Sequence, residues 1–360
     1  YILAIMDSPE IAHPRLEAVI TVDEEIGMLG AEVIDLSMLK GHKMLNIDSD
    51  VEGHFLTSCA GGMTMDTVIP VTWQKQQGYG AGLTVTGLEG GHSGSEIDKE
   101  HANANILMGR VLKYLSDRME LAVVSLAGGL KDNAIPRECE AEIVIPEEKK
   151  AELSDYITEL EKIFKKEYAV SDPAVCIEIK ENGTGEYEVL SYSSMTKVIF
   201  YLRNVPNGVQ HMSMVMPGLV ETSLNLGVLT LEKDKLTLQY AVRSAVGTAK
   251  EYLLKRIAAL VEEFGGRVTN TGNYPAWEYR RDSVLRDDMV RIFKEMYGKE
   301  PTVEAIHAGL ECGILAGKID GLDAVSIGPD MIAIHTTEEK LSISSTKRVW
   351  DYILKVIACK

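Results

Sequence analysis

The sequence predicts an α/β protein whose first domain is interrupted by an α+β insert, and three observations lead to this prediction. A chain of 360 residues is too long for one ordinary core. Short apolar, β-branched-rich runs alternate with helical patterns near both ends of the chain, which is typical of a mostly parallel sheet. In between, the order strand, helix, strand, strand, helix, strand occurs twice, which predicts two ferredoxin-like halves. We therefore expect a first domain over 1–77 and 273–360, and an inserted domain over 78–272.

The periodicity of apolar residues places the individual elements. In the interrupted domain we expect a helix over 1–6, strands over 16–22, 44–47 and 54–60, a helix between 28 and 39, and a final helix over 345–359. In the insert we expect strands over 83–86, 121–126, 140–145 and 175–179, with helices over 103–115 and 147–168. The second half of the insert repeats this order with a helix from 191 to 202, strands over 223–231 and 235–242, a helix over 249–264 and a strand over 266–271.

Composition excludes several classes of function. The formal net charge of −17 argues against a nucleic-acid partner, because phosphate binding requires clustered cations. No run approaches the roughly 18 apolar residues that cross a bilayer, so we expect no membrane partner. The five cysteines show no CxxC spacing, which is typical of reduced thiols in a cytoplasmic protein.

Asp23-Glu24-Glu25, which follows an apolar run, is the sharpest local signal for chemistry. Neighbouring side chains on extended backbone point in opposite directions, so one carboxylate can reach a metal while the other faces the attacking water. Asp48 and His335 add an oxygen and a nitrogen donor, the ligand types that zinc accepts. Taken singly, these residues have ordinary alternatives: a solvated acidic turn, a strand-end cap and a buried core histidine.

Two further features concern the insert. In Gly90-Gly91-His92-Ser93-Gly94 the glycines allow tight turning around one imidazole, which suits stabilisation of an oxyanion; the alternative is a glycine-rich turn with an exposed histidine. Arg243 ends an alternating strand and has the geometry to pair with a substrate carboxylate, although a lone arginine is more often a surface charge.

Taken together, seven motifs in order resemble the bacterial aminoacyl-histidine dipeptidases, which belong to the co-catalytic zinc aminoacylases, carboxypeptidases and carnosinases. The motifs lie at 21–28, 46–49, 59–62, 90–94, 133–138, 307–313 and 326–329. The resemblance implies that 1–77 and 273–360 form a catalytic domain and that the insert 78–272 is a lid domain. It further implies a cytoplasmic homodimer that dimerises through the lid domain and hydrolyses short peptides, Xaa-His dipeptides among them. It also implies two zinc ions per site, with manganese and cobalt as alternative metals.

The resemblance also implies roles for single residues. Glu24 looks like the general base that acts on a zinc-bound water, and His92 like the lid histidine that reaches the neighbouring subunit's site. Glu25, Asp48 and His335 look like zinc ligands. The positions that match substrate-binding residues are Asn133, Arg243, His307, Gly309 and Glu311.

The chain departs from the family pattern before Tyr1, where a His-x-Asp motif and a metal-bridging aspartate are expected. Only three of five ligands are present, so we expect the front of the protein to be missing and the 360-residue chain alone to be inactive. Two alternatives stay open at this stage. One is a deacylase or tripeptidase of the same zinc group, and the other is a non-catalytic remnant that binds a partner.

Overall fold

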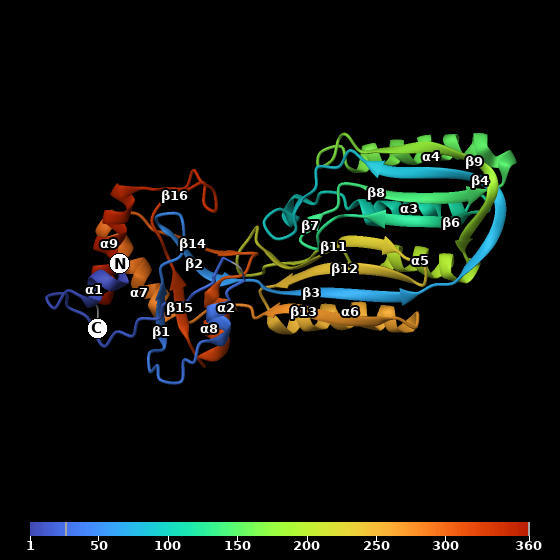
Figure 1. Ribbon diagram of the computed structural model, residues 1–360. Helices are drawn as coiled ribbons and strands as arrows, with labels where there is room; N and C mark the ends of the chain where they lie inside the picture. The colour runs from blue at the N-terminus through green and yellow to red at the C-terminus, as the bar shows by residue number, and fades with distance from the viewer. Residues whose placement is uncertain (26, 359–360) are drawn as a thin grey trace. The chain divides into compact units, whose positions relative to one another are not determined.

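The computed structural model describes residues 1–25 and 27–358, and the chain divides into two units (Figure 1). The first unit consists of Tyr1–Gly61, Ala245–Gly247 and Tyr274–Lys360, and the second of Gly62–Ser244 and Thr248–Asn273. An inserted unit therefore interrupts the first one, as the sequence predicts. Within the described part of the chain, no helix has the length and apolar character needed to span a membrane.

The first unit is built on a four-stranded sheet with the order β1-β15-β2-β14. These strands are β1 (Lys43–Asn46), β2 (His54–Cys59), β14 (Thr302–Ile306) and β15 (Asp323–Ser326). β1 pairs with β15 and β14 with β2 in parallel, while β15 meets β2 in a short antiparallel contact. The mostly parallel sheet of the prediction is thus confirmed.

Helices cover both faces of this sheet, which explains why its strands are apolar without alternation. Successive residues of a strand point to opposite faces. Phe55 packs with α1 (Ile2–Met6), α7 (Val284–Tyr297) and α9 (Ile343–Ile357), whereas the next residue, Leu56, packs on the side of α8 (Glu311–Lys318). The short strands β16 (Met331–Ile332) and β17 (Lys340–Leu341) form a separate hairpin. The predicted end of the last helix at Cys359 lies outside the described residues.

Two predicted elements of the first unit are wrong. The run 16–22 forms no strand; Leu16, Ile20 and Val22 are exposed, and the carbonyl of Val22 accepts a hydrogen bond from the Gly30 amide (3.0 Å). The helix predicted between 28 and 39 is only α2 (Leu29–Val33), because the Asp35 carboxylate accepts from the Ser37 amide (2.9 Å). Such a local side-chain bond competes with continued helix.

The second unit is built on one long sheet formed by two ferredoxin-like halves. The first half contributes β9 (Cys176–Leu190), β4 (Trp73–Thr86), β8 (Cys139–Ile145) and β6 (Ala122–Gly128) in that spatial order. The second contributes β13 (Arg267–Tyr274), β3 (Gly61–Pro70), β12 (Lys235–Ser244) and β11 (Val220–Leu231). In each half the order is fourth, first, third and second strand, and the two second strands, β6 and β11, join the halves. The predicted pair of halves is therefore confirmed.

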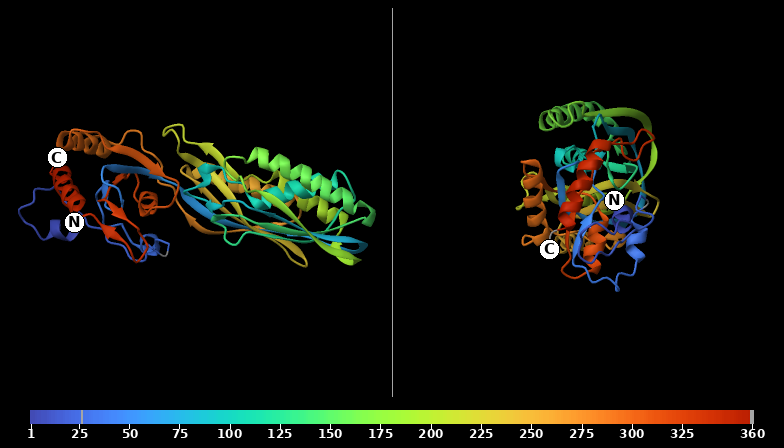
Figure 2. Two further views of the ribbon diagram at one scale, coloured as in Figure 1. Left: turned by 90° about the horizontal axis from the view of Figure 1, so that it is seen from above. Right: turned by 90° about the vertical axis from the view of Figure 1, so that its left-hand side faces the viewer.

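One face of this sheet carries the helices α3 (Ala104–Ser116), α4 (Lys150–Glu167), α5 (Tyr192–Asn204) and α6 (Gly247–Glu263) (Figure 2). Their apolar stripes and the inward residues of the strands form one continuous core. Smaller elements lie beside it: β5 (Gly91–His92), β7 (Ala134–Ile135), β10 (Gly208–Met212) and the 3₁₀ turns Ile97–Lys99 and Glu147–Lys149. β5 pairs with β7, and β10 pairs with β11.

The border of the second unit differs from the expected one between residues 77 and 78, which falls inside β4. β3 precedes β4 in the chain, yet it is the first strand of the second half and lies between β12 and β13. Its residues Met65 and Ile69 are each 1% exposed in the main core. The second unit therefore needs the residues from 62 onward.

This topology predicts that a fragment of residues 62–273 folds on its own, whereas 78–272 does not. The shorter fragment lacks β3, so β12 and β13 lose their shared neighbour and the core loses Met65 and Ile69. Urea unfolding followed by circular dichroism should give a cooperative transition for 62–273 only. Equal transition midpoints for the two fragments would contradict the assignment of β3 to this unit.

Candidate metal and substrate site

A group of carboxylates gathers in the first unit at the ends of its elements. Glu24 lies in the turn before α2, Asp48 follows β1, and Glu311 is the first residue of α8. Partial burial raises the pKa of Glu24, and the negative charges of Asp48, Glu25 and Glu311 raise it further. Desolvation by the surrounding atoms, and then Glu311 and Glu25, raise the pKa of Asp48, although this residue is exposed at the surface. Each of these carboxylates thus lies in the electric field of the others.

His335 belongs to the same neighbourhood. Its Nδ1 lies 2.9 Å from Oε2 of Glu25, with both side chains largely exposed. His335 has φ +63° and Asp23, next to Glu24, has φ +58°. The left-handed region is costly for residues other than glycine, and such strain is concentrated at functional sites. The three predicted metal ligands Glu25, Asp48 and His335 thus come from distant parts of the sequence into one place.

These residues fit a zinc ion by donor type and by charge. Carboxylate oxygen and imidazole nitrogen are zinc ligands. A dication would also offset the negative charges that, together with burial, raise the pKa values of Glu24 and Asp48. Among residues 1–25 and 27–358, no three His, Cys, Asp or Glu side chains are already drawn together as a complete metal site. Glu25, Asp48 and His335 therefore offer suitable donor types as neighbours, and their role as ligands stays a prediction.

The loop from β14 to α8 carries the predicted substrate-binding residues of this unit. His307 is 8% exposed, and Gly309 lies under the ring of Tyr274, where a Cβ atom would be 2.7 Å from Cε2. Thr21 donates a hydrogen bond from Oγ1 to Oε1 of Glu311 (2.6 Å). Thr21 belongs to the motif 21–28, but the sequence gives it no role, because its partner lies 290 residues away.

His92 is held in one orientation in the second unit. It lies on β5, opposite Ala134 of β7. Its Nδ1 accepts hydrogen bonds from the backbone amides of Gly94 and Ser95, each at 3.2 Å. A nitrogen that accepts carries no proton, so the proton of the neutral ring is on Nε2. Burial and the charge of Arg243 lower the pKa of His92, which favours this neutral form as a hydrogen-bond donor.

The other predicted residues of the second unit lie beside His92. The carbonyl of Asn133 accepts from the Ser93 amide (2.9 Å), so Asn133 adjoins the β5–β7 pair. Arg243, opposite Ser223 in the β11–β12 ladder, is near enough to act on the pKa of His92. His92 and Arg243 are therefore electrostatic neighbours, and the backbone of Asn133 adjoins the turn that carries His92.

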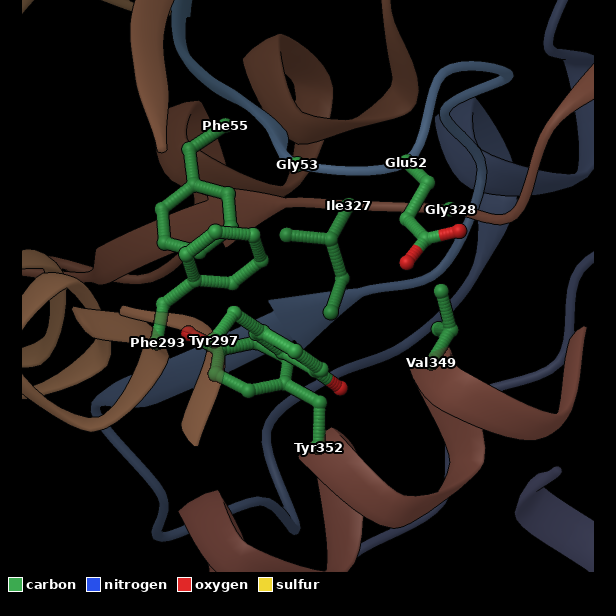
Figure 3. A pocket seen from close by; sticks show the side chains of 9 residues that line it. All are labelled: Glu52, Gly53, Phe55, Phe293, Tyr297, Ile327, Gly328, Val349 and Tyr352. Atoms are coloured by element: carbon green, nitrogen blue, oxygen red, sulfur yellow. The ribbon is translucent and has the colours of Figure 1, made fainter. Parts of the chain in front are cut away.

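A small cavity in the first unit lies apart from the predicted residues (Figure 3). It has room for about one water molecule. Rings of Phe55, Phe293 and Tyr352 form much of its wall, and the Glu52 carboxylate at its edge accepts from Arg348 Nε (2.7 Å). None of the predicted site residues lines it, so it is a packing defect of the aromatic core, and we assign it no ligand.

Comparisons with known proteins bear on the fold and on the class of enzyme. Residues 83–172 match the family model of the peptidase dimerisation domain of M20 peptidases. Cytosol non-specific dipeptidase from Escherichia coli (strain K12) is 31% identical over 360 residues, which is 99% of this chain and 73% of that protein. The crystal structure of aminoacylhistidine dipeptidase from Vibrio alginolyticus superposes with a TM-score of 0.94 at 33% identity, covering 99% of this chain and 73% of that one.

These matches confirm the resemblance predicted from the seven motifs. They also confirm the predicted fold, a peptidase domain interrupted by a lid domain, and the predicted class of enzyme, a zinc-dependent hydrolase of the metallopeptidase type.

The repulsion among the carboxylates predicts that Glu311→Gln stabilises the metal-free chain at pH 7. Burial and nearby negative charges raise the pKa values of Glu24 and Asp48 in the folded state. The part due to repulsion destabilises the fold fully above these raised values, shrinks as pH falls through them, and is absent below the unfolded pKa values. We expect a gain of about 0.5 kcal/mol in the free energy of unfolding, which shrinks towards pH 4. Glutamine keeps the acceptor for Thr21.

The measurement is urea unfolding at a series of pH values, with Glu10→Gln, an exposed residue of the same unit, as the matched control. If both variants change the free energy of unfolding equally at pH 7, the carboxylates do not form a repelling group.

Proposed function

This chain belongs to the M20 family of metallopeptidases, and we propose on that premise that the protein is a dipeptidase whose substrates include Xaa-His dipeptides. One observation carries the proposal: Glu24, Glu25, Asp48 and His335 gather in one neighbourhood, with the charge and the donor types that a zinc peptidase requires. The relatives named above give the substrate class, since one is a dipeptidase and the other acts on aminoacyl-histidine dipeptides by its name.

The metal ligands of the proposal are Glu25, Asp48 and His335, in a site that takes two zinc ions in the full-length protein. Bound zinc would supply a water of low pKa and polarise the scissile carbonyl. Manganese and cobalt are alternatives, because they accept the same ligands.

Glu24 is the general base of the proposal. Burial, and then the neighbouring negative charges, raise the pKa of Glu24, and a carboxylate whose pKa is closer to neutrality exchanges a proton more readily in both directions. The Glu24 side chain is half-buried and adjoins Glu25. Glu24 is therefore next to a proposed metal ligand and is not itself a proposed ligand. Glu24 would take the proton of the attacking water and return it to the leaving amine.

The second unit supplies the polar groups that bind the peptide. The Nε2–H of neutral His92 would donate to the oxyanion that develops on the scissile carbonyl, because the Gly94 and Ser95 amides occupy Nδ1. The guanidinium of Arg243 suits the C-terminal carboxylate of a dipeptide, and the side chain of Asn133 suits its backbone. In the first unit His307, Gly309 and Glu311 border the substrate.

We also propose that the protein works as a homodimer in the cytosol. Residues 83–172, which match the peptidase dimerisation domain, run from the end of β4 through α3, β6, β8 and α4, and so cover the central part of the first half of the second unit. His92 of one subunit would then serve the site of the other. Inactivity of the 360-residue chain by itself stays a prediction, made from its three implied ligands.

Glu24→Gln tests the assigned base. In the full-length protein loaded with zinc, we expect kcat for a Xaa-His dipeptide to fall by at least about 10³, since the water loses its proton acceptor while the shape of the side chain is kept. Zinc content, measured by mass spectrometry of the metal, should stay unchanged. Retained turnover in this variant would remove Glu24 from the mechanism. Glu10→Gln serves as the control for a lost surface charge.

The role of His92 can be tested by mixing two inactive variants. His92→Ala should lower kcat by about 10²–10³, as for the loss of an oxyanion donor, with KM and zinc content little changed. If His92 acts on the partner's site, a heterodimer of His92→Ala and Glu24→Gln subunits has one intact site. Statistical subunit exchange should then restore about a quarter of wild-type activity. A mixture that stays inactive after exchange would show that each subunit uses its own His92.

A further inference from the structure

The loop that carries His92 is closed at its base by one buried carboxylate. Oδ1 of Asp172 accepts a hydrogen bond from the Glu89 amide (2.9 Å), and Oδ2 accepts from the Ala102 amide (2.8 Å). These two amides are the two ends of the segment 89–102, and His92 lies between them. Asp172 is 0% exposed, and neither the motifs nor the roles proposed above include it. Both oxygens of a single side chain thus hold the loop ends together.

The anchor itself is fixed to the helical side of the unit. The Asp172 amide donates to the carbonyl of Tyr168, which follows α4 (2.9 Å), and the Asp172 carbonyl accepts from the Val175 amide (3.1 Å). His101 donates from Nδ1 to the carbonyl of Ser171 (3.0 Å), and this nitrogen lies 3.6 Å from Oδ1 of Asp172. A buried carboxylate needs hydrogen-bond donors, so any conformation in which Asp172 loses these donors costs free energy. The position of the loop base is therefore strongly determined.

Inside the loop, a second set of hydrogen bonds orders the turn around the imidazole. The His92 amide donates to Oε2 of Glu96 (2.8 Å), and the Glu96 amide donates to the His92 carbonyl (3.0 Å). This closes a tight turn in which the amides of Gly94 and Ser95 point at Nδ1 of His92. Gly90 and Gly91 precede it with φ +68° and +139°, and Glu100 follows with φ +53°. A segment with three residues of positive φ near its ends can adopt several backbone conformations. The closed base limits these conformations and so helps to keep the turn in place.

We propose that Asp172 is a positioning residue for His92: by tying the Glu89 and Ala102 amides together, it keeps the turn in which Nδ1 of His92 is an acceptor and Nε2–H is the free donor. The catalytic meaning of this donor rests on the proposed function, whereas the tautomer itself does not. Asp172 touches neither His92 nor substrate, and it acts through the backbone of the loop.

The direct test reads the imidazole without any assay of activity. The full chain is labelled with ¹⁵N-histidine, and the ring nitrogen shifts of His92 are assigned with His92→Gln. We expect a non-protonated Nδ1 and a protonated Nε2 in the wild type. In Asp172→Asn one loop amide faces an NH₂ group instead of an oxygen, so the base opens and the two nitrogen shifts should move towards each other as both tautomers are populated. Asp155→Asn, an exposed position of α4, is the matched control and should leave both shifts unchanged.

A kinetic cycle then separates positioning from general stability. In the zinc-loaded full-length protein, Asp172→Asn should lower kcat by about 10- to 100-fold with KM nearly unchanged, as expected for a misplaced catalytic group. In the His92→Ala background the same substitution should have no further effect on kcat, because the group that it positions is gone. A purely structural role would lower the active fraction by the same factor in both backgrounds.

The outcomes separate this inference from the proposed function. If the His92 shifts change in Asp172→Asn but His92→Ala retains full activity, the inference stands and the role proposed for His92 falls. If the shifts of His92 are the same in Asp172→Asn and the wild type, the inference is overturned whatever the kinetics show. Should the asparagine variant not fold, Asp172→Ser, which is smaller and keeps one acceptor, is tested in the same way. Loss of folding in both variants would assign Asp172 to global stability and overturn the inference.

Discussion

The second unit depends on the narrow joint between β6 and β11, where its two halves become one sheet. Among the residues that the structure describes, the pairs Leu229–Gly128 and Thr230–Ala127 define this short ladder, so neighbouring side chains must hold the register. Asn225 donates from Nδ2 to the carbonyls of Asp132 and Ala134, each at 2.8 Å. Asn103, which also caps α3, donates to Oδ1 of Asn225 (3.2 Å) and to the Leu226 carbonyl (3.0 Å). Buried amides of this kind are costly to leave unpaired, so one network fixes the joint and the strand β7 that pairs with His92.

The two units present their candidate residues in opposite physical states. In the second unit, backbone amides hold the imidazole of His92 in a single tautomer, and the loop that carries it ends on a buried carboxylate. In the first unit, Glu24 and Asp48 lie among like charges, and His335 stands on strained backbone beside an exposed Glu25. The first arrangement is preorganised for donating a hydrogen bond. The second arrangement carries unbalanced negative charge, which a bound dication would neutralise.

Much of the fold can be predicted from the sequence, because the periods of amphipathic helices and strands are local. The helices α3 to α6 and the strands β6, β8, β11 and β12 lie near their predicted positions for this reason. β3 was not predicted, because its neighbours β12 and β13 come more than 160 residues later. The run 16–22 looks like a strand by composition, but no described strand pairs with it. The glycines of β4 also need the structure for their explanation: a Cβ on Gly80 would lie 2.4 Å from the hydroxyl of Tyr187.

Among site residues, motifs point to those with family roles. Thr21 and Asp172, in contrast, act through partners that are distant in sequence, and no local pattern reveals those partners.

In the proposed dipeptidase, carboxylates and an imidazole of the first unit hold the metal. The most direct measurement follows hydrolysis of a Xaa-His dipeptide by the protein before chelation, after removal of metal, and after zinc is returned. We predict that the activity of the wild type disappears with the metal and returns with zinc. A protein with Asp48→Ala should neither recover activity nor take up the wild-type amount of zinc, because a ligand is lost. Hydrolysis that survives complete removal of metal, or full recovery of zinc content and activity in Asp48→Ala, would contradict the role of these residues as metal ligands.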